Sequence, residues 1–298
     1  MLNFLGFGVS KKKILVTGAT GMLGSTLVPF LRGRGHAVTT QGRLSIADFP
    51  ADLTRVSDAR ALIAEVVPDV IVNLIGLTSV EGCEENLHRA YLVNTKTVEN
   101  IADAVRNQGI DSHLIHISTD HIYDGSGFHT EGDVTITNNY AITKYAGELA
   151  ALQVRSAILR TNFIGRSRVE GRQSLTDWVF QSMKRGESIE VLTDVLFSPL
   201  SMMCVSEMVD VVAHKEPVGV FNLGSRGGMS KADLDFAFAE AVGLPTKSMT
   251  RINSSEARFL RAYRPKNMRM DSSKFETALG VTLPTLEEEI KRVVREYE

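Results

Sequence analysis

Tyr140 and Lys144 stand four residues apart, in the segment Tyr-Ala-Ile-Thr-Lys, and could carry out acid–base chemistry on a carbonyl group. On a helix this spacing places both side chains on one face. A phenol, with an ordinary pKa of about 10, donates a proton poorly at neutral pH unless a nearby ammonium lowers that pKa. We therefore predict that Lys144 lowers the pKa of the phenol and holds a nicotinamide ribose. Tyr140 would then protonate a carbonyl oxygen as hydride reaches its carbon.

A hydroxyl side chain precedes this pair at the end of an apolar segment. Thr119 lies in Ser-Thr-Asp, directly after residues 113–117. In a parallel sheet the carboxyl ends of the strands face the ligand crevice, so Thr119 can donate a hydrogen bond to the same carbonyl. A Tyr-x-x-x-Lys pair alone also occurs on ordinary helix surfaces. Its combination with Thr119 and with an earlier glycine loop is far more specific.

Three glycines with the spacing Gly-x-x-Gly-x-x-Gly lie between a short apolar segment and a helical pattern near the start of the chain. Glycines let the backbone turn tightly and approach a pyrophosphate closely, while the N-terminus of the helix faces the anion. The alternative is that they serve turn geometry alone. Their placement favours a dinucleotide site, which we assign to Gly18, Gly21, Met22, Leu23 and Gly24.

The residues after the second apolar segment indicate which dinucleotide binds. An NAD site normally has Asp or Glu there to hold the ribose 2′-hydroxyl. Here the sequence is Thr-Thr-Gln-Gly-Arg, ending at Arg43, and no acidic residue precedes Asp48. Arg43 could pair with a 2′-phosphate, or it could be a solvated loop charge. We predict NADPH as the cofactor and leave NADH open as the alternative.

Strand and helix patterns alternate through the first half of the chain. This alternation predicts an α/β fold, a doubly wound parallel sheet (Rossmann-like) with a smaller C-terminal substrate-binding lobe. We place the NADP-binding domain at residues 1–165, with a later strand near 219–223 returning to the sheet, and the lobe mainly at 166–298. The expected strands cover 13–17, 37–40, 70–74, 113–118, 156–161 and 220–223, and the expected helices cover 22–33, 56–67, 84–107 and 140–153.

Composition narrows the class of protein. The chain has 298 residues, is 43% hydrophobic and carries a net charge of −2, which is ordinary for a globular enzyme and indicates no nucleic-acid partner. We find no apolar run of about 18 residues, so we expect no membrane partner. Two cysteines, Cys83 and Cys204, make neither a disulfide framework nor a four-cysteine zinc site, and we expect no metal. The apolar residues 1–9 are expected to lead into the first strand. We predict a cytoplasmic enzyme, and a homodimer stays open.

The chain resembles the extended short-chain dehydrogenases/reductases and, within them, the dTDP-4-dehydrorhamnose reductase family. The resemblance runs from the glycine loop almost to the C-terminus. The segments that carry it are Gly18–Gly24, Pro68–Asn73, Ser118–Gly125, Tyr140–Lys144, Arg160–Phe163, Arg264–Asn267 and Leu283–Pro284. The family usually has Gly at position 141 and Trp at position 163, whereas Ala141 and Phe163 stand here.

The resemblance implies a role for each matching position. The implied cofactor contacts are Met22 to Gly24 at the pyrophosphate, Asp52 and Leu53 at the adenine, and Gly76, Leu77 and Thr78 beside the nicotinamide. The implied catalytic set is Thr119, Tyr140 and Lys144, and the implied substrate contacts are Thr119, Asp120 and Phe163. We add Arg264 as a partner for the substrate phosphates, with a rim salt bridge as the equal alternative.

The implied reaction is NADPH-dependent reduction of the 4-keto group of a nucleotide-linked 6-deoxysugar, for deoxysugar and cell-surface polysaccharide synthesis. Two alternatives stay open. Nucleotide-sugar dehydratases carry Asp followed by Glu where this chain has Asp120 followed by His121, and epimerases share the fold. Other relatives are NADP-binding regulatory subunits, such as that of methionine adenosyltransferase. The base, the sugar and the face of hydride attack stay open too.

Overall fold

Seven parallel strands form the central sheet, in the order β11-β6-β5-β4-β1-β2-β3. The computed structural model describes residues 11–298, so the expected lead-in at residues 1–9 lies outside the described residues. β4, β5 and β6 are buried along their whole length, as apolar strands covered on both faces should be. The predicted doubly wound sheet is confirmed. Its strands are β1 Lys13–Thr17, β2 Ala37–Gly42, β3 Phe49–Pro50, β4 Val70–Asn73, β5 His113–Thr119, β6 Ser156–Thr161 and β11 Gly219–Leu223.

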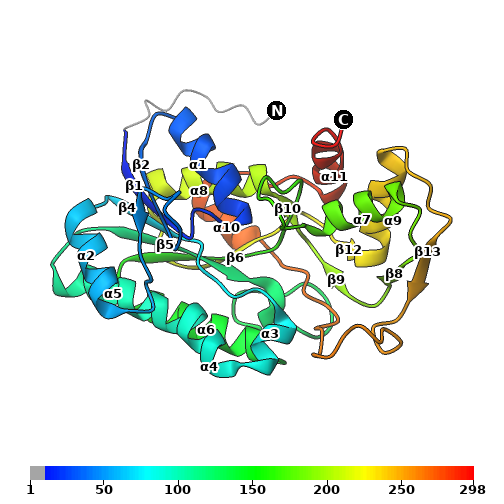
Figure 1. The fold of residues 1–298 in the computed structure, drawn as a ribbon, viewed down its shortest axis with the longest axis horizontal. Helices are drawn as coiled ribbons and strands as arrows, with labels where there is room; N and C mark the ends of the chain where they lie inside the picture. The colour runs from blue at the N-terminus through cyan, green and yellow to red at the C-terminus, as the bar shows by residue number, and fades with distance from the viewer. Residues whose placement is uncertain (1–10) are drawn as a thin grey trace.

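Helices cover both faces of the sheet (Figure 1). On one face lie α1 (Met22–Gly33), α8 (Met202–Lys215) and α10 (Ser273–Leu279), whose apolar side chains share one core with alternate residues of β1, β4 and β5. On the other face, α2 (Val56–Val66), α5 (Thr97–Asn107) and α6 (Asn139–Ala151) pack on the intervening strand residues. Side chains alternate across a strand, so the two cores follow directly from the strand sequences.

The single helix expected at residues 84–107 is wrong. The chain forms α3 (Val80–Glu85), α4 (Leu87–Tyr91), a π-helical turn at Leu92–Lys96, and then α5. Asn86 ends α3 and starts α4, because its side chain accepts a hydrogen bond from the Arg89 amide. The π-helical turn contains Asn94, whose side chain is used elsewhere, as described below.

A second hydrophobic core lies beside the sheet and is built by the C-terminal part of the chain (Figure 1). The segments from Leu200 to Leu223 and from Ser273 to Leu283 cross back and pack on the sheet. The division at residue 165 stays a prediction. No helix within residues 11–298 is long and apolar enough to cross a membrane. The remaining elements are β7 Phe163–Ile164, α7 Leu175–Lys184, β8 Ile189–Leu192, β9 Leu196–Phe197, β10 Leu200–Ser201, β12 Met229–Ser230, α9 Lys231–Ala241, β13 Met249–Ile252 and α11 Leu286–Val294.

Candidate active site

The glycine loop forms a cradle of bare backbone between β1 and α1. Gly18 has φ +69°, a conformation that favours glycine, and a Cβ there would lie 3.0 Å from the Ile75 amide nitrogen. A Cβ on Gly24 would lie 2.7 Å from the carbonyl carbon of Ala19, so α1 packs here without room for a side chain. α1 begins with no side-chain cap and no acidic residue in its first turn. Its first N–H groups are therefore available to an anion.

The end of β2 fastens this loop. The Gly18 amide donates to Oε1 of Gln41 at 3.0 Å, and the Ala19 amide donates to the Gln41 carbonyl at 3.0 Å. The sequence analysis did not identify Gln41. Its position at the end of the second strand, opposite the glycines, is the signal that could have found it. Arg43 follows the last residue of β2, Gly42, and its side chain is exposed.

An acidic side chain does reach β2, contrary to the expectation that none lies there. Asp48 folds back, and its Oδ2 accepts hydrogen bonds from the Thr40 amide at 2.9 Å and the Thr40 hydroxyl at 2.8 Å. These hydrogen bonds hold the pKa of Asp48 below its ordinary value, so it is ionised. Arg32 forms an ion pair with it at 3.2 Å. The expectation that no acidic residue lies at the end of the second strand failed because a loop supplies the carboxylate. The ion pair with Arg32 balances the charge of Asp48.

The residues implied at the adenine and nicotinamide ends occupy the carboxyl ends of the neighbouring strands. Asp52 accepts a hydrogen bond from the Thr54 hydroxyl at 2.8 Å, and Leu53 is buried. Gly76 and Thr78 are exposed, and Leu77 between them is half-buried. These positions fit the roles that the resemblance implies, which stay predictions.

Asn94 ties the loop at residues 76–78 to the helix that carries Tyr140. Its Oδ1 accepts from the Leu77 amide at 2.7 Å, and its Nδ2 donates to the Thr143 hydroxyl at 3.0 Å. Gly147 lets α6 approach closely, because a Cβ there would overlap the Asn94 carbonyl oxygen. The π-helical turn thus serves to place a side chain between two site segments.

The three residues expected to be catalytic come together at the carboxyl end of β5. Thr119 and Tyr140 are 4% and 7% exposed, and the Thr119 side chain acts to lower the pKa of Tyr140. Lys144, one turn further along α6, donates from Nζ to the Ile117 carbonyl at 2.7 Å. α6 starts at the right place because Asn138 caps it, accepting from the Ala141 amide at 2.8 Å.

Burial governs the protonation states of these groups. It raises the pKa of Tyr140, against the opposing effect of the Thr119 hydrogen bond, and it lowers the pKa of Lys144 to about 8. The expectation that Lys144 lowers the pKa of Tyr140 is therefore wrong for the protein alone. The buried phenol stays protonated at neutral pH.

Asp120 and His121 continue the chain beyond Thr119. Burial raises the pKa of Asp120 to about 6, and Asn162 donates to its Oδ2 at 2.8 Å. The His121 ring lies edge-on to Tyr140, with 5.3 Å between ring centroids, and burial lowers its pKa to about 3. His121 is therefore neutral at physiological pH.

A buried ion pair supports the ends of β5 and β6 beneath the site. Nη2 of Arg160 lies 2.7 Å from Oε2 of Glu148, and both side chains are at most 2% exposed. The Ser118 hydroxyl donates to the same carboxylate, and Arg160 also donates to the Tyr123 hydroxyl at 2.8 Å. Sequence reasoning missed Glu148, although it stands four residues after Lys144 on the same helix.

The substrate side is formed by segments far apart in the chain. Tyr140 packs with Val80, Cys83 and Ala262. Nη2 of Arg264 donates to both carboxylate oxygens of Glu81, at 2.6 and 2.7 Å, which is the salt-bridge alternative considered above. Its contact with the substrate phosphates stays a prediction. The contact of Phe163 with the sugar nucleotide also stays a prediction, and Phe163 is half-buried against the sheet core.

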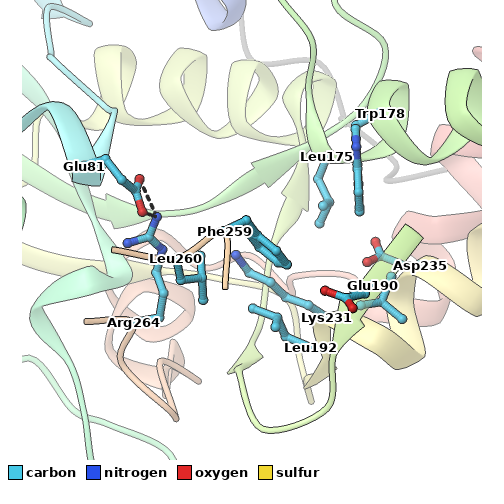
Figure 2. A pocket seen from close by; sticks show the side chains of 11 residues that line it. Glu81, Leu175, Trp178, Glu190, Leu192, Lys231, Asp235, Phe259, Leu260 and Arg264 are labelled. Carbon is cyan, nitrogen blue, oxygen red and sulfur yellow. Dashed lines mark hydrogen bonds and ion pairs between the residues drawn. The ribbon is translucent and has the colours of Figure 1, made fainter. Parts of the chain in front are cut away.

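A cavity of about 300 Å³ adjoins the Glu81–Arg264 pair, and we call it the Trp178 pocket (Figure 2). Two residues of α9 that the sequence analysis missed line it, Lys231 and Asp235. Among the described residues no hydrogen bond or ion pair to the Lys231 ammonium is found, and the charges of Asp120 and Asp235 both act on it. The signal that could have found them is their spacing of four at a helix start, the spacing of Tyr140 and Lys144.

Within residues 11–298, His36, Asp210 and His214 have ligand atoms close enough to hold a metal ion. The Lys12 amide donates to Nδ1 of His36 at 3.2 Å, so Nε2 carries the proton and donates to Asp210 at 2.8 Å. Nδ1 of His214 donates to the Asp210 carbonyl at 2.7 Å. The nitrogens that face Asp210 are donors, so the group is a hydrogen-bonded contact between α8 and the turn that joins α1 to β2.

The sequence is similar to proteins of one family over almost its whole length. The family model described as the RmlD substrate binding domain matches residues 12–298. The chain is 30% identical over 289 residues to the Probable low-salt glycan biosynthesis reductase Agl14 of Haloferax volcanii, with 92% of this chain and 95% of that protein covered. It is 28% identical to the dTDP-4-dehydrorhamnose reductase of Escherichia coli K12, covering 95% and 97% of the two chains.

A solved structure shares the fold over almost the whole chain. The dTDP-4-dehydrorhamnose reductase of Bacillus anthracis, solved in complex with NADP, superimposes with a TM-score of 0.87 at 22% identity. The superposition covers 96% of this chain and all of the other.

Proposed function

The chain belongs to the RmlD substrate binding domain family, and we propose that it reduces the 4-keto group of a nucleotide-linked 6-deoxysugar with NADPH. It is thus an NADP(H)-dependent oxidoreductase of the kind that makes deoxysugars for polysaccharides. One observation carries the proposal. Thr119 and Tyr140 are nearly buried at the carboxyl end of β5, with Lys144 one turn further along α6 and its Nζ on the Ile117 carbonyl.

NADPH, when bound, supplies the hydride. The chain fits it at the glycine loop, where an added Cβ would fill the cradle and the uncapped start of α1 presents N–H groups. We assign the pyrophosphate to these groups and the 2′-phosphate to Arg43. Lys144 and the loop at residues 76–78 are assigned to the nicotinamide ribose end. A Cβ on Gly76 would lie 4.0 Å from Nζ of Lys144, so these two elements border one space.

Tyr140 supplies the proton in this proposal. Its raised pKa keeps the phenol protonated, which is the form a reductase needs at the start of the reaction. Thr119 orients the substrate carbonyl by donating a hydrogen bond. As the carbonyl oxygen gains negative charge it draws the proton from Tyr140, while Lys144 is assigned to the nicotinamide ribose.

The substrate diphosphate is assigned to the space between this centre and the Trp178 pocket. Arg264, the residue expected there, is already paired with Glu81, and the salt bridge leaves less of its charge for a phosphate. Lys231 has no hydrogen-bonding partner among residues 11–298 and acts electrostatically on Asp120. We therefore assign the main phosphate contact to Lys231, with Arg264 beside it.

NADPH oxidation, followed by absorbance, tests the proposal. dTDP-4-keto-6-deoxysugars from a dehydratase and an epimerase are supplied, with UDP, GDP and CDP analogues in parallel. We expect turnover with at least one of them, and a fall in kcat of about 10²- to 10⁴-fold in Tyr140→Phe with NADPH affinity unchanged. Tyr145→Phe, on the same helix, is the control and should match the wild type.

Two outcomes contradict the proposal. Unchanged turnover in Tyr140→Phe removes that residue from the mechanism. Tight NADPH binding without reduction of any ketosugar favours a regulatory subunit instead. NADPH and nucleotide sugars are cytoplasmic metabolites, so we propose a cytoplasmic enzyme, and the homodimer left open by the sequence stays a prediction.

A further inference from the structure

His121 lies beside Tyr140 and has no part in the proposed reduction. It belongs to the short helical turn Asp120–Ile122, and its backbone amide donates a hydrogen bond to Oγ1 of Thr119 at 3.1 Å. Its ring stands edge-on to the ring of Tyr140, with 5.3 Å between the two centroids. The imidazole is therefore held against the proposed proton donor, at a fixed position relative to Thr119.

The surroundings of His121 place its imidazole on the substrate side of Tyr140. The residue is half-buried, so part of it stays accessible. The charges of Lys231 and Arg264, which both line the Trp178 pocket, act on the imidazole. Its Nδ1 is buried and has no hydrogen-bond partner within residues 11–298. The ring thus borders the space that is assigned to the substrate, between Tyr140 and the pocket.

The imidazole of His121 is in the form that accepts a proton. Burial, with smaller effects from the charges of Lys231 and Arg264, lowers its pKa to about 3, so the ring is neutral at physiological pH. A neutral imidazole has one ring nitrogen with a free lone pair. The substrate diphosphate, which is assigned to Lys231, offsets the two positive charges and so raises the pKa of His121. The imidazole therefore becomes a stronger base when the substrate binds.

A base at this position faces a carbonyl compound whose oxygen is bound by an acid. A carbonyl group makes the hydrogen on the neighbouring carbon acidic, and a base and an acid that act together can remove it. We propose that the site has a second activity, enolisation of the 4-keto sugar, in which His121 removes a proton from a carbon next to C4 while Tyr140 protonates the carbonyl oxygen. The inference rests on the proposed function for the ketosugar substrate, and the reaction itself goes beyond that function.

The enolisation balances without the cofactor. The carbon–hydrogen bond breaks, its proton passes to a ring nitrogen of His121, and its electron pair forms a carbon–carbon double bond to C4. The π electrons of the carbonyl pass to the oxygen, which takes the proton of Tyr140. The imidazolium then exchanges its proton with solvent, and the reverse steps restore the ketone with a solvent hydrogen on carbon. Nothing is oxidised or reduced.

Hydrogen exchange in heavy water tests this activity apart from reduction. The full chain is incubated with a dTDP-4-keto-6-deoxysugar, made by a dehydratase, and with NADP⁺, which cannot donate hydride. We expect deuterium to enter C3 or C5 of the sugar, seen by proton NMR, at least about tenfold faster than in the sugar alone. The UDP, GDP and CDP analogues are run in parallel, and NADPH oxidation in ordinary water is measured for each sugar.

Two variants separate the base from the acid. His121→Gln keeps a polar side chain and loses the base, so we expect exchange to fall at least about 100-fold and reduction to change by less than about tenfold. Tyr140→Phe removes the acid that both reactions need, so exchange and reduction should both fall. His88→Gln, exposed on α4, is the matched control and should behave as the wild type.

The outcomes distinguish this inference from the proposed function. Reduction of a ketosugar by the wild type without exchange above that of the sugar alone overturns the enolisation and leaves the proposed function intact. Equal losses of exchange and reduction in His121→Gln indicate a structural role and overturn the assignment of the base. Exchange without reduction of any ketosugar contradicts the proposed function and supports the enolisation, and the absence of both reactions contradicts both. The wild-type measurement needs no variant, so it decides the matter even if His121→Gln does not fold.

Discussion

The glycine loop and the Trp178 pocket differ in the groups that they present to a ligand. The loop presents backbone N–H groups, and side chains are excluded at Gly18 and Gly24. The pocket is lined by side chains, and two of its ionisable groups, Lys231 and Asp235, have few or no polar partners among the described residues. The loop is contained within a short stretch of sequence, whereas the pocket combines residues from 81 to 264.

This difference shows how stability and function are divided in the chain. The backbone site costs the fold little, because a strand, a turn and a helix form it without burying charge. The pocket and Lys144 carry groups that the fold pays to bury. Substitutions in the loop should therefore damage folding and cofactor binding together. Substitutions of the buried ionisable groups should weaken function while leaving stability unchanged or improved.

The largest effect is expected at Gly24. Gly24→Ala places a Cβ against the Ala19 carbonyl and must shift α1, so we expect a loss of about 3 kcal/mol in unfolding free energy and about 100-fold in NADPH affinity. Gly33→Ala, in the last turn of the same helix, has nothing within 4 Å of its new Cβ and should be neutral or slightly stabilising. Denaturant unfolding and fluorescence titration measure both. Equal stability and equal NADPH affinity in the two variants would contradict the assignment of the glycine loop as the cofactor phosphate site.

Lys231→Met tests the pocket side of the comparison. The loss of the ammonium should weaken dTDP binding about tenfold or more, since hydrogen bonds to charged groups are among the stronger ones. NADPH affinity should not change. Calorimetric titrations with each ligand measure both. If this variant loses NADPH as well, the two regions are not separable.

Lys144 links stability to pH in the direction opposite to that of a lysine whose pKa is raised on folding by an ion pair. Its pKa falls from 10.5 to about 8 on folding, so between these values the unfolded chain binds more protons. Wild-type stability from this group therefore rises with pH from about 8 to 10.5, and below 8 the full cost of the buried charge is present.

Lys144→Met should therefore unfold at a higher temperature than the wild type at pH 7, and this advantage should vanish as pH approaches 10.5. Turnover should be lost, and wild-type turnover should fall as pH rises through about 8. Thermal melts across this range measure the effect, with exposed Lys247→Met as the control. A variant less stable than the wild type at pH 7 would contradict this account.

The smallest effect is expected at Arg43, because the side chain is exposed. Arg43→Ala should weaken NADPH binding by about fivefold and leave NADH binding unchanged, since exposed ion pairs contribute at most about 1 kcal/mol. Dissociation constants for both reduced cofactors measure it. Equal losses for the two would place Arg43 away from the 2′-phosphate.

The sequence by itself determined the parallel sheet, the phosphate loop and the order of Thr119, Tyr140 and Lys144. These features depend on local rules: apolar period, glycine conformation, helical spacing and the end of a sheet at which parallel strands terminate. The first and last residues of α1 and β1 were predicted correctly for the same reason.

Only the tertiary structure decided the rest. Asp48 folds back on Thr40, Asn94 reaches Leu77 from a π-helical turn, and Arg264 pairs with Glu81. These contacts join residues that are 8, 17 and 183 positions apart. No pattern of neighbouring residues predicts them. The pKa values of Tyr140 and Asp235 follow from burial, which long-range packing sets. Backbone conformation is determined largely by neighbouring residues in the sequence, whereas the solvation of a side chain depends on every segment that packs around it.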